Sequence, residues 1–174
     1  LKSLFDRLFA EASVAFDFVW VRVMPPGLSS PLHFDHVYMN RGSDKVLSVW
    51  IPFSKVYPQN GSLFIIEKSN RFEDLIDKYR GVDVDRMGFS CGAVNINPIT
   101  LAKERKKSLL TSNFEPGDIL IFEMFLLHAS FDNNSPTKEV RFSCDVRYQP
   151  DSGVKDNRWF GVCPAGHNNK SYAG

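Results

Sequence analysis

The sequence is built from short segments rich in β-branched and aromatic residues, each bounded by turn-forming residues, and this pattern restricts the fold more than any other feature. Residues 46–53 and 62–67 illustrate it, because the turn Gln59-Asn60-Gly61 lies between two such segments. The predicted strands cover residues 17–24, 46–53, 62–67, 118–124 and 140–148. Short strands joined by turns are typical of a mainly β fold, a sandwich or a barrel.

Helices are predicted mainly at the start of the chain and in insertions between the strands, where apolar residues recur at helical spacing. The predicted helices cover residues 2–14, 71–80 and 101–110. The last of these carries a basic cluster of Lys103, Arg105, Lys106 and Lys107, which is typical of a solvated helix face. The tail after Pro150 contains Gly, Asn, Lys and Pro throughout, so we predict an irregular conformation there.

Length and charge narrow the class of protein. With 174 residues, the chain has the size of one domain, which we expect to cover residues 1–174. The 21 Lys and Arg residues nearly balance the 20 Asp and Glu residues, so we expect neither nucleic acid nor an anionic membrane surface as a partner. No apolar run approaches the length needed to span a bilayer. Because the chain opens at Leu1 within a helical pattern, we expect a piece of a longer polypeptide, in which a targeting segment is not observable.

The three cysteines, Cys91, Cys144 and Cys163, are widely spaced and form no C-x-x-C pair. This spacing predicts neither a disulfide framework nor a thiolate zinc site. We expect buried free thiols, in the cytoplasm or another reducing compartment.

The segment Leu32-His33-Phe34-Asp35-His36 contains the most informative side chains. On an extended strand, residues two apart point to the same face, so His33 and Asp35 can converge on one cation while His36 points away. A histidine from a distant strand would complete the two-histidine, one-carboxylate ligand set of non-haem Fe(II) oxygenases. His128 follows the apolar strand 118–124 and is the best candidate, whereas His167 lies in a polar tail and is predicted to be a surface residue. Taken alone, an H-x-D segment is more often structural, with a core histidine bonded to the aspartate.

Two longer stretches carry a resemblance to a known family. They are HFDHVYMNRGSDKVLSVWIPFSKVYPQNGSLFIIEKSN and FEPGDILIFEMFLLHASFDNNSPTKEVRFSCDVRYQP. The first resembles the H-x-D segment, the W-x-P strand and the N-G turn of the phytanoyl-CoA dioxygenase family of Fe(II)/2-oxoglutarate oxygenases. The second resembles the family's distal motif, a G-D turn followed by an apolar strand, L-H-x-S and an arginine before the last strand. The sequence departs from the family pattern at Glu67-Lys68-Ser69-Asn70 and in its short N-terminal portion.

The resemblance implies a double-stranded β-helix, or jelly roll, with peripheral helices. It implies Fe(II), 2-oxoglutarate and O₂ as cofactor and cosubstrates, and a small organic molecule as the substrate to be hydroxylated. The residues matching the family's iron ligands are His33, Asp35 and His128. The residues matching its cosubstrate contacts are Arg141, with Ser130 as a helper, Trp50 near the cosubstrate and Tyr38 near the iron.

The loop between Ser130 and Arg141 is slightly longer than is usual in the family, so Arg147 is a second candidate for the carboxylate anchor. Arg141 and Arg147 are six residues apart, so both would face the same way on a regular strand, and the one that is not the anchor could pair with an acid or with the substrate. A guanidinium pairs bidentately with a carboxylate, which suits either arginine to the role. Asp35 occupies the position that is a small residue in related halogenating enzymes, so we expect hydroxylation or a related oxidation.

Three alternatives remain at this point. A nucleic-acid demethylase of the AlkB type also has H-x-D…H and two arginines, but the near-zero charge argues against it. A non-catalytic jelly-roll binding module would be expected to have lost at least one of the four residues His33, Asp35, His128 and Arg141. A metal-dependent cupin isomerase needs no anchoring arginine.

Overall fold

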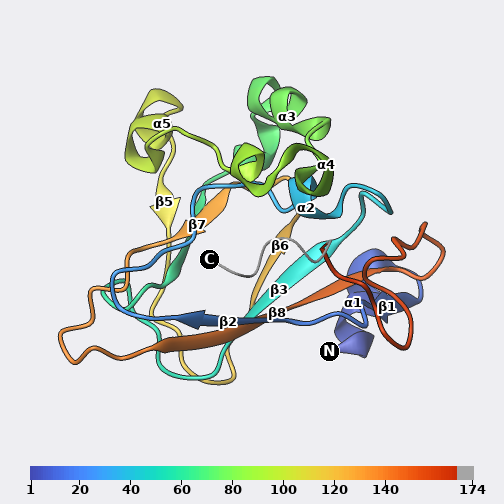
Figure 1. Ribbon diagram of the computed structural model, residues 1–174, viewed down its shortest axis with the longest axis horizontal. Helices are drawn as coiled ribbons and strands as arrows, with labels where there is room; N and C mark the ends of the chain where they lie inside the picture. Colours follow the sequence, from blue (N-terminus) through green and yellow to red (C-terminus); the bar gives the residue numbers. More distant parts are fainter. Residues whose placement is uncertain (168–174) are drawn as a thin grey trace.

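The computed structural model describes residues 1–167, in which two antiparallel β-sheets face each other (Figure 1). The larger sheet contains β1 (Ser13–Ala15), β2 (Trp20–Met24), β3 (Leu47–Pro52), β6 (Leu120–Glu123) and β8 (Arg141–Pro150). The smaller sheet contains β4 (Leu63–Ile66), β5 (Leu109–Leu110) and β7 (His128–Ser130). The strands predicted from the sequence are all present, shifted by a few residues at their ends.

Strand β8 is the centre of the larger sheet. It pairs with β3 along one edge and with β1 and β2 along the other. Because side chains alternate along a strand, Arg141, Asp145 and Arg147 are buried on its inner face while Phe142 is exposed on the other. The interior between the sheets is therefore polar and charged at this strand, which is unusual for a core and marks the functional face.

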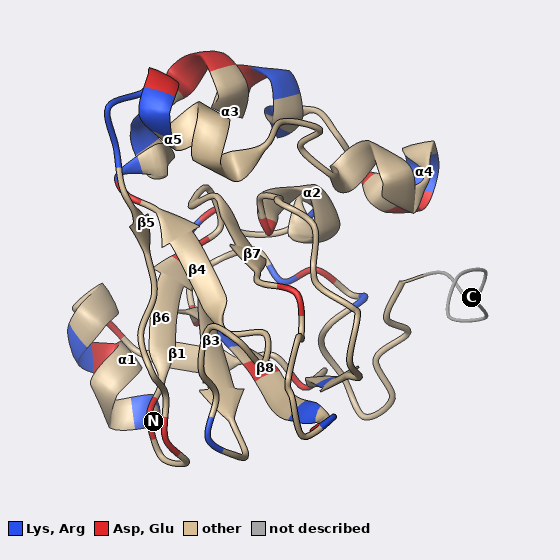
Figure 2. Ribbon diagram, turned by 90° about the vertical axis from the view of Figure 1, so that its left-hand side faces the viewer, with Lys and Arg blue, Asp and Glu red and all other residues tan. Residues whose placement is uncertain are grey.

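The helices lie outside the sheets. They are α1 (Lys2–Phe9), α2 (His36–Met39), α3 (Glu73–Arg80), α4 (Val84–Met87) and α5 (Pro98–Glu104), with short 3-10 helices at Ser69–Arg71 and Phe89–Gly92. Helices α3, α4 and α5 gather at one side of the molecule and α1 lies at the opposite side (Figures 1 and 2). The side chains of Phe64 and Ile66 in β4 pack beneath this helical side, together with Leu75 and Leu101.

Two helices have bounds that differ from those predicted. The helix over 2–14 stops at Phe9, since Ala10 takes a left-handed conformation with φ 57° and Ser13–Ala15 joins β8. The helix over 101–110 instead begins earlier, at Pro98. Asn97 caps it by accepting hydrogen bonds from the backbone N–H groups of Ile99 and Thr100, and Leu109–Leu110 pairs with β4.

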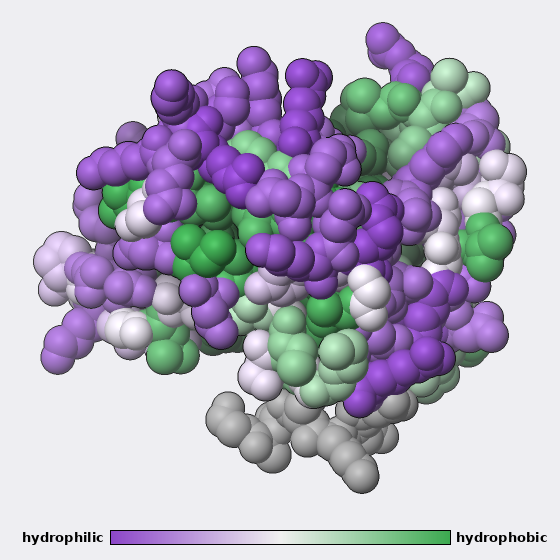
Figure 3. Space-filling model, turned by 90° about the horizontal axis from the view of Figure 1, so that it is seen from above, coloured by the Kyte–Doolittle hydropathy of each residue, from purple (hydrophilic) through white to green (hydrophobic). Residues whose placement is uncertain are grey.

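The surface of the helical side is mixed in charge. Acidic and basic residues alternate over α3 and α5 (Figure 2), and Arg105 from the predicted basic cluster forms an ion pair with Asp74. From above, the surface is mainly hydrophilic with small hydrophobic patches (Figure 3). Within residues 1–167, no helix is both long and apolar enough to cross a bilayer.

All three cysteines are free thiols. Cys144 is buried, as predicted, but Cys91 and Cys163 are exposed, so the expectation of three buried thiols is wrong. Cys91 lies in the short 3-10 helix Phe89–Gly92 and Cys163 lies in a bend. Residues 151–167 of the predicted irregular tail form turns and bends, and the rest of that tail lies outside the described residues.

Asn133 fixes the loop that leads into β8. Its fully buried side chain donates to the carbonyl oxygens of Met24 (2.9 Å) and Glu139 (2.8 Å) and accepts from the N–H of Ser135 (3.1 Å). We expect Asn133→Ala to lower the free energy of unfolding by about 2–4 kcal/mol, because two carbonyls lose their donor inside the protein. Chemical denaturation measures the change.

The matched control is Asn134→Ala, since Asn134 is exposed and its side chain makes no hydrogen bond within the described residues. This control is expected to change the free energy of unfolding by less than about 0.5 kcal/mol. Equal effects of the two substitutions would contradict the role of Asn133.

Candidate metal centre

His33, Asp35 and His128 meet between the two sheets. One ligand atom from each lies within 4.8 Å of the others, and all three side chains are buried. The Nε2 atoms of His33 and His128 are each 3.6 Å from Asp35 Oδ1. The three residues that the sequence singled out are thus brought together.

Local backbone geometry brings the ligands to this point. His33 and His128 pair as a β-bridge in which each backbone N–H donates to the other residue's carbonyl, at 3.1 and 3.2 Å. Asp35 is not on an extended strand as expected, because the chain turns into α2 and Asp35 has helical angles, φ −61° and ψ −26°. His36 lies away from the centre, with Nε2 3.0 Å from the Arg80 carbonyl oxygen.

The tautomer of both histidines is fixed by a carbonyl two residues earlier. His33 Nδ1 lies 2.7 Å from Pro31 O, and His128 Nδ1 lies 3.0 Å from Leu126 O. A carbonyl oxygen only accepts, so Nδ1 carries the proton in each ring. Each Nε2 faces Asp35 Oδ1 at 3.6 Å and is the nitrogen through which the ring can bind a metal.

The ionisation states suit a cation. Burial raises the pKa of Asp35, but Arg147, His33 and His128 outweigh burial and hold this pKa well below its ordinary value. Burial, together with the neighbouring His33, lowers the pKa of His128 to about 4. A carboxylate and a neutral imidazole are therefore present at neutral pH.

Asp35 is oriented by two donors on its other oxygen. Ser48 Oγ and Arg147 Nη2 (3.1 Å) both donate to Oδ2, which leaves Oδ1 as the oxygen facing the histidines. The guanidinium carbon of Arg147 also lies 3.9 Å from the ring centroid of Trp20. Arg147 is thus paired with the carboxylate of Asp35. Of the two arginines predicted to face the same way, Arg147 is the one that binds this acidic side chain.

Arg141 is buried and incompletely paired. Its Nη1 donates to the Gly61 carbonyl oxygen at 2.8 Å, while Nε and Nη2 have no partner among residues 1–167. Burial, together with the nearby charge of Arg22, lowers its pKa to about 10, so it is still a cation at neutral pH. A buried cation with two unused donors fits a carboxylate ligand, since a buried guanidinium requires an anionic partner.

The remaining predicted contacts lie close to these residues. The Trp50 ring lies 5.8 Å from the Arg141 guanidinium carbon, and its Nε1 has no partner within the described part of the chain. Ser130 accepts a hydrogen bond from the Ser30 N–H at 2.7 Å and makes none with Arg141. The ring centroid of Tyr38 lies 5.5 Å from that of His33, edge to face.

A cavity of about 270 Å³ opens beside His33 and Asp35. Its lining includes Trp20, Arg22, Tyr38, Met39, Phe89 and Arg147, together with His33 and Asp35. Arg22 was not predicted as a site residue, although the alternation of side chains on β2 places it on the inner face, where it pairs with Asp145.

His167 also lines this cavity, which contradicts the prediction that it lies on the surface. Its side chain is 3% exposed and Nδ1 lies 3.0 Å from Asp85 Oδ1. The residue before it, Gly166, has φ +68° and its N–H donates to the Arg158 carbonyl, while a Cβ at this position would meet the Phe18 ring at 2.8 Å. The only sign of this burial in the sequence is Gly166, and a single glycine is not enough to predict that its neighbour is buried.

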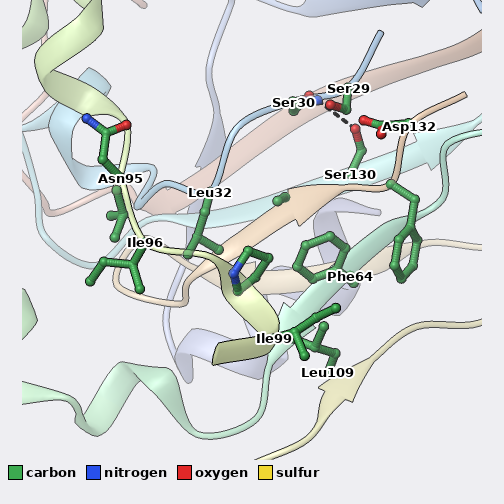
Figure 4. Close-up of a pocket in the computed structure, with 14 residues that line it drawn as sticks. Ser29, Ser30, Leu32, Phe64, Asn95, Ile96, Ile99, Leu109, Ser130 and Asp132 are labelled. Carbon is green, nitrogen blue, oxygen red and sulfur yellow. Dashed lines mark hydrogen bonds between the residues drawn. The ribbon is translucent and has the colours of Figure 1, made fainter. Parts of the chain in front are cut away.

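A larger cavity, of about 550 Å³, lies between the smaller sheet and the segment around α5 (Figure 4). Phe64 and Ala129 line it from the face of the smaller sheet that also packs against the helices, and Ile99 and Leu109 line it as well. Leu32 and Ser130 lie close in sequence to His33 and His128, but none of His33, Asp35 and His128 lines this space. The cluster of these three side chains, and not the size of a cavity, therefore marks the candidate site.

Comparison with known sequences gives one family and related enzymes. Residues 4–141 match the family described as Phytanoyl-CoA dioxygenase (PhyH). A 1-deoxypentalenic acid 11-beta-hydroxylase of Streptomyces arenae is 28% identical over 161 residues, covering 86% of this chain and 53% of that protein. The chain therefore spans about half the length of the curated relatives it matches.

Solved structures show the same fold. EctD of S. alaskensis with 2-oxoglutarate and 5-hydroxyectoine has 19% identity and a TM-score of 0.64, covering 87% of this chain and 49% of that one. SnoN, a non-heme alpha-ketoglutarate-dependent epimerase from nogalamycin biosynthesis, has 13% identity and a TM-score of 0.62, covering 94% and 61%. The predicted jelly-roll architecture is confirmed by these likenesses.

Proposed function

The chain belongs to the phytanoyl-CoA dioxygenase family, and on this premise we propose that it is an Fe(II)- and 2-oxoglutarate-dependent dioxygenase that hydroxylates a small organic molecule. The reaction would convert 2-oxoglutarate and O₂ to succinate and CO₂ as the substrate gains a hydroxyl group. The observation that carries the proposal is the convergence of two imidazole Nε2 atoms and one carboxylate oxygen at a buried point. This ligand set leaves coordination positions open for a cosubstrate and O₂.

In this proposal His33, Asp35 and His128 hold the iron and Arg141 receives the distal carboxylate of 2-oxoglutarate. Bound iron supplies the oxygen chemistry. The protein's own part is orientation. The Pro31 and Leu126 carbonyls fix the two imidazole rings, and Ser48 and Arg147 fix the carboxylate. Trp50 and Ser130 are proposed as further cosubstrate contacts and Tyr38 as a contact near the iron.

The substrate is proposed to be a small molecule because the cavity beside the ligands holds about 270 Å³. The hydroxylase relative is named for an organic acid, which agrees with this size class. A nucleic-acid demethylase is less favoured, since the basic cluster beside α5 is paired with or mixed among acidic residues. We further propose that residues 1–174 form one domain.

The proposal is tested by adding Fe(II) and 2-oxoglutarate to the protein without oxygen. We expect a visible charge-transfer absorption from the keto acid chelated to iron, saturating at one equivalent of each. Zn(II) in place of Fe(II) is the control and gives no such band, because its d shell is full. If Fe(II) and 2-oxoglutarate together produce no band, the cosubstrate assignment is wrong.

A further inference from the structure

His167 shares the cavity of the metal ligands without taking part in the centre itself. It reaches the cavity wall from the C-terminal segment, beyond residue 141 where the family match ends. Three aromatic side chains surround its ring, with centroid distances of 4.8 Å to Trp159, 5.1 Å to Phe89 and 5.8 Å to Tyr38. A polar ring in such a position needs a reason beyond packing.

Asp85 sets the orientation of this ring. Its Oδ1 lies 3.0 Å from His167 Nδ1, and since a carboxylate only accepts, Nδ1 carries the proton. Asp85 is itself held by Arg158, whose Nη1 donates to Oδ2, and by Arg41, 3.7 Å away. Because the carboxylate is held by two cations, it presents a fixed acceptor to the imidazole.

Asp85 occupies Nδ1, so Nε2 is the ring nitrogen that can serve a ligand in the cavity, where His167 is one of the lining residues. Burial lowers the pKa of His167, and although Asp85 acts in the opposite direction, the net shift is downward. The neutral ring with its proton on Nδ1 has an acceptor lone pair at Nε2.

The charges around the cavity are balanced in pairs. Arg22 and Arg147 line this space, and each is bound to a carboxylate, that of Asp145 and that of Asp35. A neutral hydroxyl group can donate to His167 without bringing an uncompensated charge into this site. The rest of the lining, Trp20, Met39 and Phe89, suits an apolar carbon skeleton.

We propose that His167, oriented by Asp85, accepts a hydrogen bond from a hydroxyl group of the substrate and so selects hydroxyl-bearing apolar molecules over analogues that lack the donor. This proposal rests on the proposed function, since it places the substrate in the cavity beside the metal ligands. His167 is a specificity-determining residue in this scheme and takes no part in the chemical step.

The test compares two probes of the same size, cyclohexanol, which donates a hydrogen bond, and cyclohexanone, which only accepts. Their binding is followed by tryptophan fluorescence, because Trp20 lines the cavity and Trp159 contacts His167. For the wild-type protein loaded with Zn(II) and 2-oxoglutarate, we expect cyclohexanol to bind roughly 3- to 10-fold more tightly, the range of one hydrogen bond. Equal affinities, or no saturable binding of either probe, would overturn the proposal.

Two substitutions place the preference on His167. His167→Phe keeps an aromatic ring among its neighbours but removes both nitrogens, so the preference for cyclohexanol is expected to fall to about onefold. His167→Gln retains an acceptor oxygen and is expected to keep part of it. Val154→Ala, in the same segment at a 70% exposed position, is the matched control and should retain the full preference.

The readouts separate the two proposals. The anaerobic charge-transfer band of the wild-type protein with Fe(II) and 2-oxoglutarate reports on the proposed function alone. If the band forms and the wild type shows no preference between the probes, only the role of His167 fails. If His167→Phe keeps the wild-type preference, His167 is not the acceptor, and this result needs only a thermal unfolding midpoint close to the wild-type value to be valid.

Discussion

Asp35→Ala is expected to reduce succinate formation to the level of a reaction without enzyme. Asp35 provides the only carboxylate of the three-residue cluster, and its Oδ1 faces both histidine Nε2 atoms at 3.6 Å. Removing it leaves the two imidazoles without an anionic ligand beside them, and leaves the cation Arg147 unpaired, which repels Fe(II). Succinate formation and bound iron per protein are the measurements, and both are expected to fall. His33→Ala is expected to act in the same direction.

The matched control is Asp44→Ala. Asp44 is an exposed carboxylate that contacts His36 at 3.8 Å, outside the cluster. This substitution should leave succinate formation and bound iron near their wild-type values. Because the loss of Asp35 leaves Arg147 without its carboxylate, Asp35→Asn is a second variant that keeps the side-chain shape. Wild-type turnover in both Asp35→Ala and His33→Ala would show that these residues are not the ligands.

Arg141→Ala is expected to raise the KM for 2-oxoglutarate by about 100-fold or more. Truncating one partner of a buried, hydrogen-bonded charge pair costs about 2–5 kcal/mol, which corresponds to roughly 30- to several-thousand-fold in affinity. The guanidinium has two donors, Nε and Nη2, without a partner in the described structure, so the carboxylate would have been their acceptor. Succinate formation as a function of 2-oxoglutarate concentration measures the effect.

Arg147→Ala is the comparison that makes this result specific. Arg147 donates to Asp35, so its removal is expected to weaken iron binding by roughly 10- to 100-fold, as for other groups that orient a metal ligand. With iron at saturation, the KM for 2-oxoglutarate should change far less than in Arg141→Ala. The opposite order of effects would make Arg147 the anchor and Arg141 the supporting residue.

The strands and the pairing of His33 with Asp35 could be predicted from the sequence because both depend on short-range patterns. Alternating apolar residues and turn residues locate the strands, and His33 and Asp35 are close enough in sequence to be recognised together. The local reason for this pairing was wrong at Asp35, which lies at the start of α2 instead of on a strand. The side chains converge in either conformation, so the error had no consequence for the site.

The features that sequence analysis missed depend on tertiary contacts. His167 is buried because Asp85, 82 positions earlier, accepts its hydrogen bond and because Gly166 turns the chain against Phe18. Leu109–Leu110 becomes a strand because the edge of β4 is available to pair with it, against the helical pattern of its own residues. Neither the hydrogen bond between Asp85 and His167 nor the available edge of β4 can be recognised from a short stretch of sequence.

The β-bridge holds His33 and His128 at a fixed separation, whereas Asp35 is positioned independently of them. The two histidines exchange both backbone hydrogen bonds, so a displacement of β7 carries the partner segment with it and preserves the separation of the two imidazoles. Asp35 belongs to a different unit, the first turn of α2, and is tied to the larger sheet through Ser48 and Arg147. A shift between the two sheets would therefore move the Asp35 carboxylate relative to the fixed pair of imidazole nitrogens. The relative position of the two sheets thus sets the distances between the carboxylate and the two nitrogens.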